Sequence, residues 1–214
     1  MNKINLVLDL DETLINTLQF NFNNNKTTNL DFSNNSTIGI INLPNYLSIV
    51  FLRPYLKSFL VFCYKYFNVS FWTAGSSLYC KEVLKLILTE DQYENTQIIL
   101  AKEDKCYIEL KTNKVFYCNQ DLKIGKDLSI IWEDDNLGFF FRPNNTLIID
   151  DNSFVINENP QNSVRINPFS QKTKDDRVLC QLSNWLNMCK DVDDVRYLDK
   201  ELVIIPDNCS ILEI

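Results

Sequence analysis

The chain has 214 residues, a formal net charge of -7 and no histidine. Without histidine, catalytic triads that contain this residue are excluded, and proton transfer must use carboxylates. The negative charge disfavours a nucleic-acid partner. No apolar run reaches the roughly 18 residues of a membrane span, and no secretory signal begins the sequence, so we expect a soluble intracellular protein of the nucleus or cytoplasm, with no membrane partner.

The length and the apolar content of 45% suffice for one well-packed domain. Because no linker or internal repeat divides the sequence, we predict a single domain over residues 1–214 with its core at about residues 4–190. The seven cysteines lie too far apart for a zinc site of CxxC type. Their spacing predicts reduced, partly buried thiols rather than a disulfide framework.

The first part of the chain predicts a buried strand and an insertion. The apolar run at residues 4–10 is typical of a central parallel strand. Residues 16–37 are rich in Asn, Ser and Thr and predict a surface excursion. The apolar stretches at residues 38–43 and 47–52 predict a hairpin, and helical spacing of apolar residues over 54–67, with Pro54 at its start, predicts a helix.

Strands and helices then alternate. Residues 68–74 predict a strand, and residues 76–88 predict a helix that Ser76 or Ser77 could cap. We expect further strands at residues 97–101, 105–110, 114–118, 127–132 and 144–150, and a last helix at residues 177–190. This alternation predicts an α/β fold: a central, mainly parallel sheet flanked by helices, with a small β insertion.

Two of the predicted strands end in paired carboxylates. Asp9 and Asp11 end the first strand, and Asp150 and Asp151 end the strand at 144–150. In an open parallel sheet, ligands collect at the carboxyl ends of the strands. Hard oxygen ligands without histidine or paired cysteine suit Mg²⁺ far better than zinc. An aspartate before a helix is also a common N-cap, and this interpretation stays open for either pair taken alone.

Two further polar residues lie next to strand edges. Thr73 ends the strand at 68–74 and offers a hydroxyl group, and Lys126 precedes the predicted strand at 127–132 and offers an ammonium group. Each of them alone can be an ordinary surface or turn residue.

These residues form motifs that resemble a known family. Residues 9–13, Asp-Leu-Asp-Glu-Thr, resemble the DxDx(T/V) signature of the haloacid dehalogenase superfamily, in the form used by phosphatases of the RNA polymerase II C-terminal domain (CTD). Similar motifs follow in the order of that group, so that the resemblance covers nearly all of residues 4–169: they lie at residues 52–60, 71–74, 126–129 and 147–152. The resemblance implies a fold of the haloacid dehalogenase type, a Rossmann-like α/β domain.

Details of the motifs resemble two types within the CTD phosphatase group. In the small CTD phosphatases, Pro-x-Asn follows ten residues after the first member of the last acidic pair. Pro160 and Asn162 stand in this relation to Asp150, so Asp150 and Asp151 form the matching pair. Residues 53–60, 144–151 and 159–169 most resemble the type that carries a ubiquitin-like domain. Only eight residues precede Asp9, so we expect that domain to be missing here.

The resemblance implies a role for each motif residue. Asp9 would attack phosphorus and form an aspartyl-phosphate, and Asp11 would act as general acid and then as general base. Thr73 and Lys126 would bind the phosphoryl oxygens, and Thr13 and Arg53 would shape the loop and the helix entry. Mg²⁺ would be the cofactor, and its ligands would come from the acidic motifs: Asp9, the backbone carbonyl of Asp11, Asp150 and Asp151.

The implied function is that of a Mg²⁺-dependent protein serine/threonine phosphatase. Its partner would be a phosphorylated protein or peptide, with the RNA polymerase II CTD as one candidate. One alternative is a catalytically inactive scaffold of the same fold that binds peptides, and another is a phosphatase acting on small-molecule or nucleic-acid-end phosphates. The intact set of motif residues favours an enzyme. Residues 16–52 and 101–125, which would select the substrate, do not separate the enzyme alternatives.

Overall fold

A computed structural model describes residues 3–21, 38–103, 106–117 and 125–200 of the chain. Its main sheet has seven strands in the order β10-β9-β1-β5-β6-β7-β8. The first five of these are parallel, and β7 and β8 form an antiparallel edge. The predicted mainly parallel sheet is therefore confirmed. The strands are β1 (Asn5–Leu8), β5 (Asn68–Ser76), β6 (Ile99–Glu103), β7 (Cys106–Glu109), β8 (Val115–Tyr117), β9 (Thr146–Asp150) and β10 (Ser163–Arg165).

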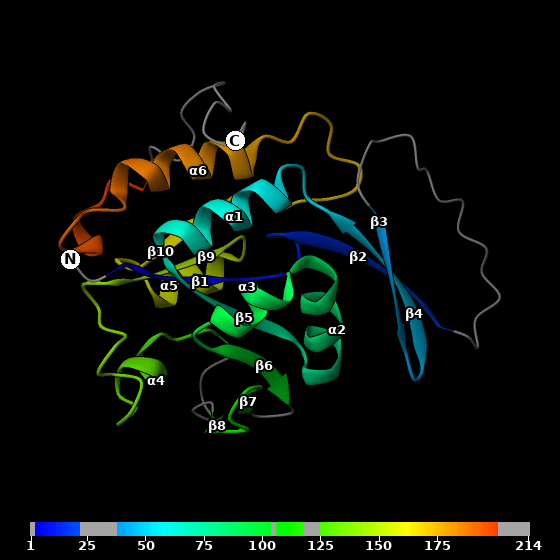
Figure 1. Cartoon of the computed structure of the whole chain (residues 1–214), viewed down its shortest axis with the longest axis horizontal. Coiled ribbons are helices and arrows are strands. Elements are labelled where there is room, and N and C mark those ends of the chain that lie inside the picture. The colour runs from blue at the N-terminus through cyan, green and yellow to red at the C-terminus, as the bar shows by residue number, and fades with distance from the viewer. Residues whose placement is uncertain (1–2, 22–37, 104–105, 118–124, 201–214) are drawn as a thin grey trace.

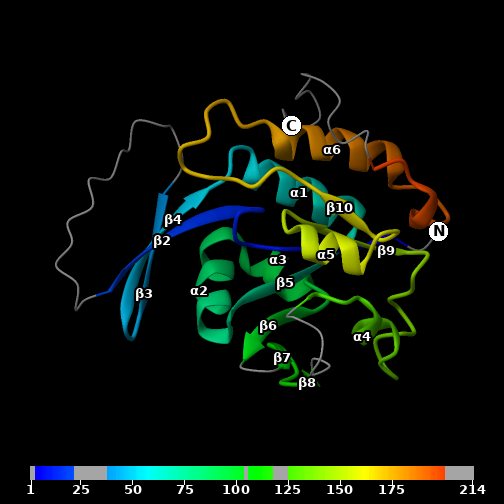
Figure 2. The same cartoon turned by 180° about the vertical axis from the view of Figure 1, so that it is seen from behind.

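Helices cover both faces of this sheet. Leu6 and Leu8 of β1 pack into a core shared with three helices, while Val7 between them points into a second core on the opposite face. Figures 1 and 2 show α1 and α6 lying side by side along the sheet, with α5 on the other face. The first face carries α1 (Leu56–Tyr66), α2 (Ser77–Ile87) and α6 (Val178–Cys189), and the second carries α4 (Ser129–Trp132) and α5 (Ser153–Glu158).

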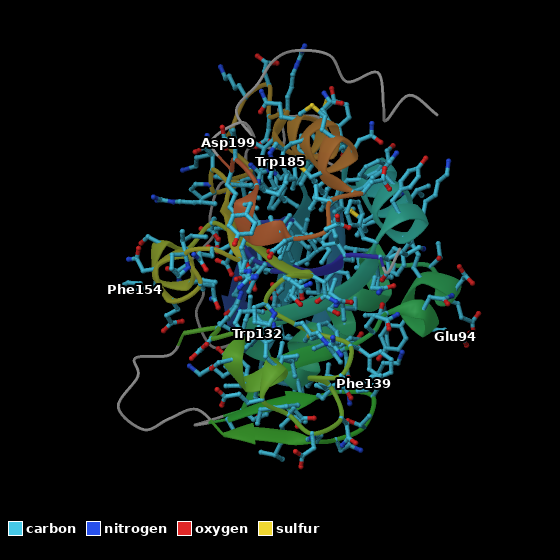
Figure 3. All side chains as sticks on the ribbon, turned by 90° about the vertical axis from the view of Figure 1, so that its left-hand side faces the viewer. Glu94, Trp132, Phe139, Phe154, Trp185 and Asp199 are labelled. Carbon is cyan, nitrogen blue, oxygen red and sulfur yellow. The ribbon has the colours of Figure 1, made fainter. Side chains whose placement is uncertain are left out.

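Large aromatic side chains show the difference between core and surface. Trp185 of α6 is 1% exposed, whereas Phe139 and Phe154 are 73% and 62% exposed. In Figure 3, Trp185 lies beneath its helix, and Phe154 extends from the outer side of α5. The core on the α6 side thus contains a large aromatic side chain, Trp185, from a helix that the sequence pattern predicted.

The strand predicted at residues 127–132 is wrong. This segment forms the single helical turn α4, in which Leu128 and Ile131 are both fully buried at helical spacing. Asn159 accepts a hydrogen bond from the Leu128 backbone N–H at 2.9 Å, and Asp127 accepts one from Ser129 N–H at 2.9 Å. A short apolar run fits a strand or a helix equally well, and here contacts from distant residues decide.

The insertion forms a separate three-stranded antiparallel sheet in the order β2-β4-β3. It consists of β2 (Ile15–Asn21), β3 (Ile38–Leu43) and β4 (Tyr46–Leu52), and the predicted hairpin of β3 and β4 is confirmed. The predicted surface excursion at 16–37 is wrong for residues 16–21, which pair with β4, and its remainder lies outside the described residues. Gly39 brings β3 against α2, because a Cβ there would lie 2.2 Å from Leu86 Cδ2.

Several short elements lack a clear sequence pattern, namely α3 (Glu90–Asn95), α5, β10 and the 3-10 turn Val195–Tyr197. Of the described cysteines, four are free. Cys180 is disulfide-bonded, so the expectation of uniformly reduced thiols fails at this residue. Within the part of the chain that the structure describes, no helix combines the length and apolar character needed to cross a membrane.

Candidate active site

The carboxyl ends of β1 and β9 bring three aspartates together. The two strands pair in parallel, with Leu8 opposite Ile149, and Asp9 N–H donates to the Ile149 carbonyl at 3.1 Å. Asp9, Asp150 and Asp151 follow directly, and one carboxylate oxygen of each lies within 4.8 Å of the others. We call these three residues the acidic cluster. Its position is the one expected for a ligand site of a parallel sheet.

Lys126 lies against this cluster. Its ammonium group donates to Asp9 and, at 2.7 Å, to Asp150 Oδ2. The side chain is 6% exposed, so the ion pairs are shielded from water. Asn159, at the end of α5, donates from Nδ2 to the Lys126 backbone carbonyl at 2.8 Å and thereby fixes the segment that carries the lysine.

The electrostatics of the acidic cluster are dominated by burial. Burial raises the pKa of Asp9 to about 7, opposed by the Lys126 ammonium and reinforced by the Asp150 carboxylate. The pKa of Asp151 is also raised, first by burial and then by Asp150. Burial would lower the pKa of Lys126, but the carboxylates of Asp9 and Asp150 outweigh it, so the net shift is upward. The cluster therefore favours additional positive charge.

Asp11 lies on a tight turn and faces other partners. The Leu14 and Ile15 N–H groups both donate to the Leu10 carbonyl, at 2.8 and 3.0 Å, and Glu12 has a φ of 57°. Among the described residues, Asp11 is not a member of the acidic cluster, although its negative charge contributes to the raised pKa of Asp9.

The Asp11 carboxylate is bound by two hydroxyl groups instead. The Tyr79 hydroxyl donates to Asp11 Oδ1, and Thr17 Oγ1 lies 3.4 Å from the same oxygen. Burial raises the pKa of Asp11, and both hydroxyl groups, together with Lys126, oppose the shift. Sequence reasoning missed Tyr79 and Thr17.

Thr73 is fully buried and is the last buried residue of the neighbouring strand β5 (Asn68–Ser76). Its Oγ1 accepts a hydrogen bond from Gly75 N–H at 2.9 Å. Among the described residues, no hydrogen bond joins it to the acidic cluster. Because β5 pairs directly with β1, Thr73 nevertheless shares the carboxyl edge of the sheet with Asp9.

Thr13 and Arg53 support the turn. Thr13 Oγ1 lies 3.4 Å from Asp151 Oδ1 and donates to it. Arg53 Nη1 donates to the Thr13 carbonyl at 2.8 Å, and its guanidinium pairs with Asp176 through two hydrogen bonds of 3.0 Å. Arg53 makes these contacts away from the acidic cluster, in agreement with the expectation that it shapes the loop.

Several curated proteins resemble this chain. It is 28% identical over 151 residues to the ubiquitin-like domain-containing CTD phosphatase 1 of Xenopus tropicalis, and the matched region covers 69% of this chain and 45% of that protein. It is 30% identical over 156 residues to the corresponding Arabidopsis thaliana protein, with 69% and 42% covered. It is 29% identical over 193 residues to the putative CTD phosphatase-like protein 355R of Invertebrate iridescent virus 6, with 86% and 97% covered. The chain thus spans less than half of the first two relatives and nearly all of the viral one.

Solved structures show the same fold. The chain matches a structure of fission yeast RNA polymerase II CTD phosphatase Fcp1 bound to beryllium fluoride with a TM-score of 0.52 and 20% identity, covering 78% of this chain and 42% of that chain. A second Fcp1 structure matches with a TM-score of 0.52 and 18% identity, covering 93% and 46%. These matches confirm the predicted haloacid-dehalogenase-like fold. The family model described as NLI interacting factor-like phosphatase matches residues 4–196, and this chain therefore belongs to that family of haloacid-dehalogenase-type phosphatases.

Proposed function

We propose that this chain is a Mg²⁺-dependent protein serine/threonine phosphatase that hydrolyses phosphoserine or phosphothreonine in peptide segments through an aspartyl-phosphate intermediate. The observation that carries the proposal is the convergence of the acidic cluster and Lys126 at the carboxyl edge of the sheet, in a chain of a phosphatase family. A carboxylate at such an edge is suited to attack a phosphate ester when a neighbouring positive charge offsets its own negative charge.

Asp9 is the proposed nucleophile, and Asp11 is the proposed proton donor. Asp9 attacks phosphorus, and Asp11 protonates the serine or threonine oxygen that leaves. In the second step, Asp11 takes a proton from the water that hydrolyses the aspartyl-phosphate. The separate surroundings of the two carboxyl groups support this division of roles, because Asp9 is paired with Lys126 and Asp11 is bound by hydroxyl groups.

The acidic cluster fits a divalent cation. Oxygen ligands of Mg²⁺ lie about 2.1 Å from the ion, so two of them are at most about 4.2 Å apart. The oxygens of Asp9, Asp150 and Asp151 lie within 4.8 Å of one another, and small side-chain adjustments bring them into this range. The backbone carbonyl of Asp11 is a proposed fourth ligand. Bound Mg²⁺ supplies positive charge that offsets the repulsion between the Asp9 carboxylate and the phosphate.

Lys126 and Thr73 are the proposed ligands of the phosphoryl oxygens. The Lys126 ammonium already contacts Asp9, the residue that would receive the phosphoryl group. Thr73 is buried in the adjacent strand β5. Its oxygen accepts a hydrogen bond from Gly75 N–H, so its own hydroxyl proton can be donated to a phosphoryl oxygen.

The proposed partner is a phosphorylated protein or peptide. The relatives are named as CTD phosphatases, and for this chain we infer the same substrate class, with phosphorylated repeats of the RNA polymerase II CTD as the first candidates. Action on such a substrate implies a place in the nucleus or, for other phosphoproteins, in the cytoplasm.

Magnesium dependence provides the direct test. Purified protein is expected to release phosphate from phosphoserine peptides, including CTD repeats phosphorylated at different serines, only when Mg²⁺ is present. Phosphate release is measured with and without excess chelator, and Mg²⁺ is then restored. Equal rates in chelator and in Mg²⁺ would contradict the metal site. Binding of the phosphopeptides without any turnover would instead indicate an inactive scaffold.

A phosphoryl mimic tests the nucleophile without relying on turnover alone. Beryllium fluoride is expected to bind at the Asp9 carboxylate in place of a transferred phosphoryl group and to inhibit phosphate release. Thermal unfolding should also shift upward with beryllium fluoride and Mg²⁺ together, because a ligand that binds only the folded state stabilises it. The Asp9→Asn protein should show no such shift. An unchanged melting temperature in the wild-type protein would argue for a different nucleophile.

A further inference from the structure

The Asp11 carboxyl group is held by a relay of two hydroxyl groups from separate elements. Tyr79, in the first turn of α2, donates to Asp11 Oδ1, and Thr17 Oγ1 of β2 lies 2.7 Å from the Tyr79 hydroxyl oxygen. Each hydroxyl group has a single proton to donate. Since the Tyr79 proton is directed at Asp11, the short contact to Thr17 takes its proton from Thr17. Donation therefore runs from Thr17 to Tyr79 to Asp11.

Both hydroxyl groups reach the same carboxylate oxygen. Thr17 Oγ1 also lies 3.4 Å from Asp11 Oδ1, while Oδ2 receives no hydrogen bond from any residue in the described ranges. The terminal torsion of an aspartate side chain is broad and roughly two-fold, so an unheld carboxyl group exchanges its two oxygens by rotation. The hydrogen bond from Tyr79 to Oδ1, which Thr17 supports by donating to the Tyr79 hydroxyl, fixes this rotation and leaves Oδ2 available for a proton.

The Tyr79 ring is itself firmly placed. Its side chain is 5% exposed and packs on the backbone of Gly75, where a Cβ would lie 2.5 Å from Tyr79 Cδ1. Gly75 follows Thr73 within β5, where the pairing with β6 shifts register, and donates to the Thr73 hydroxyl. The phenol ring thus contacts the last part of β5, which carries Thr73, while its hydroxyl group reaches the turn that carries Asp11.

We propose that Tyr79 and Thr17 are positioning residues for proton transfer, which hold Asp11 Oδ1 so that Asp11 Oδ2 exchanges the proton with the leaving group and then with water. The inference rests on the proposed function. In the first step, an Asp9 oxygen bonds to phosphorus, the bond from phosphorus to the leaving oxygen breaks, and that oxygen takes the proton from Asp11 Oδ2. In the second step, a water oxygen bonds to phosphorus, the Asp9 oxygen departs, and the water proton returns to Asp11 Oδ2.

A positioning role for proton transfer predicts a dependence on the leaving group. Phenol, with a pKa of about 10, and the serine alcohol need a proton as they depart. The nitro group of 4-nitrophenol stabilises the departing anion, so this leaving group needs a proton far less. Loss of the relay should therefore slow the first two substrates much more than the third.

The experiment compares Tyr79→Phe and Thr17→Val with the wild-type chain at saturating Mg²⁺. The substrates are 4-nitrophenyl phosphate, phenyl phosphate and a phosphoserine peptide. Only the first step depends on the leaving group, so the comparison uses kcat/KM, which reports the reaction up to the departure of that group. Because positioned acid catalysis contributes about 10²–10⁴-fold, we expect kcat/KM of Tyr79→Phe to fall about tenfold or more on the last two substrates. On 4-nitrophenyl phosphate it should fall about threefold at most.

Matched variants separate positioning from a general effect of the substitution. Tyr64→Phe removes a phenol hydroxyl that contacts Thr96 at 2.6 Å, outside the site, and should leave all three rates unchanged. Thr17→Ser keeps the hydroxyl and should restore the rates that Thr17→Val loses. Thr17→Val, which replaces one hydroxyl on a half-buried side chain, gives the decisive measurement if Tyr79→Phe does not fold.

Two results would overturn the inference. An equal fall of kcat/KM on all three substrates would assign Tyr79 to substrate binding or to the fold. If Thr17→Ser failed to restore what Thr17→Val lost, the hydroxyl relay would be rejected. Absence of turnover by the wild-type chain on every substrate would overturn the proposed function itself, and this outcome is distinct from a uniform effect of the variants.

Discussion

Replacement of Asp9 by asparagine is expected to abolish phosphatase turnover while the protein stays folded. The asparagine amide carries no negative charge and is a poor nucleophile toward phosphorus, so the aspartyl-phosphate cannot form. A loss of about 10⁴-fold or more in kcat follows if Asp9 is the nucleophile. The fold should survive, because asparagine has nearly the same shape and its oxygen can still accept from Lys126. Phosphate release measures the first effect, and circular dichroism with thermal unfolding measures the second.

Asp91→Asn is the matched control for this substitution. Asp91 is an exposed residue of α3, outside the acidic cluster, and the same chemical change there should leave turnover unchanged. If Asp9→Asn retained turnover comparable to the wild type, another residue would have to be the nucleophile. If the Asp9→Asn protein were unfolded, the stability of the core would depend on the negative charge that Asp9 places next to Lys126.

The close approach of Asp9 to Asp150 and Asp151 could be predicted from the sequence because it follows from a general rule. Buried parallel strands appear as apolar runs, and their carboxyl ends share one edge of the sheet. Lys126 is different, since it is 24 residues away from Asp150 and precedes a segment whose secondary structure the pattern predicted wrongly. Its place near the cluster came from motif order, and the side chain of Asn159 that fixes it gave no sequence signal.

Tyr79 and Thr17 could not be found from local pattern for a related reason. Tyr79 lies on the same buried helix face as Val83 and therefore had the pattern of a core residue. Thr17 falls in a stretch rich in Asn and Thr that favours a loop by composition, yet it pairs with Val50 in β2 and β4. Strand pairing across the insertion overrode the local preference. The two residues could have been predicted only with the knowledge that β2 lies next to the start of α2, where Thr17 contacts Tyr79.

Loss of the Arg53 side chain is expected to cause the largest fall in stability. Arg53 is 1% exposed and its guanidinium pairs with buried Asp176 at 3.0 Å. It also donates to the carbonyls of Thr13 and Asn167 at 2.8 and 2.7 Å and lies 5.6 Å from the ring centroid of Phe169. Arg53→Met leaves the Asp176 charge and two carbonyls without these donors. Breaking a buried pair in this way costs about 3–5 kcal/mol, which urea unfolding can measure.

The fate of the Asp176 charge decides whether this explanation is right. In the double variant Arg53→Met/Asp176→Leu, the unpaired buried carboxylate is gone, so the protein should be more stable than Arg53→Met alone. It should remain below the wild type by about 1 kcal/mol or more, because Asp176 also accepts from Val178 N–H at the start of α6, at 3.1 Å. Lys85→Met breaks the exposed pair with Glu82 and should change stability by about 0.5 kcal/mol at most. If Arg53→Met lowered the free energy of unfolding no more than Lys85→Met, the buried pair would not be what holds the turn at Thr13, the segment at Asn167 and the start of α6 together.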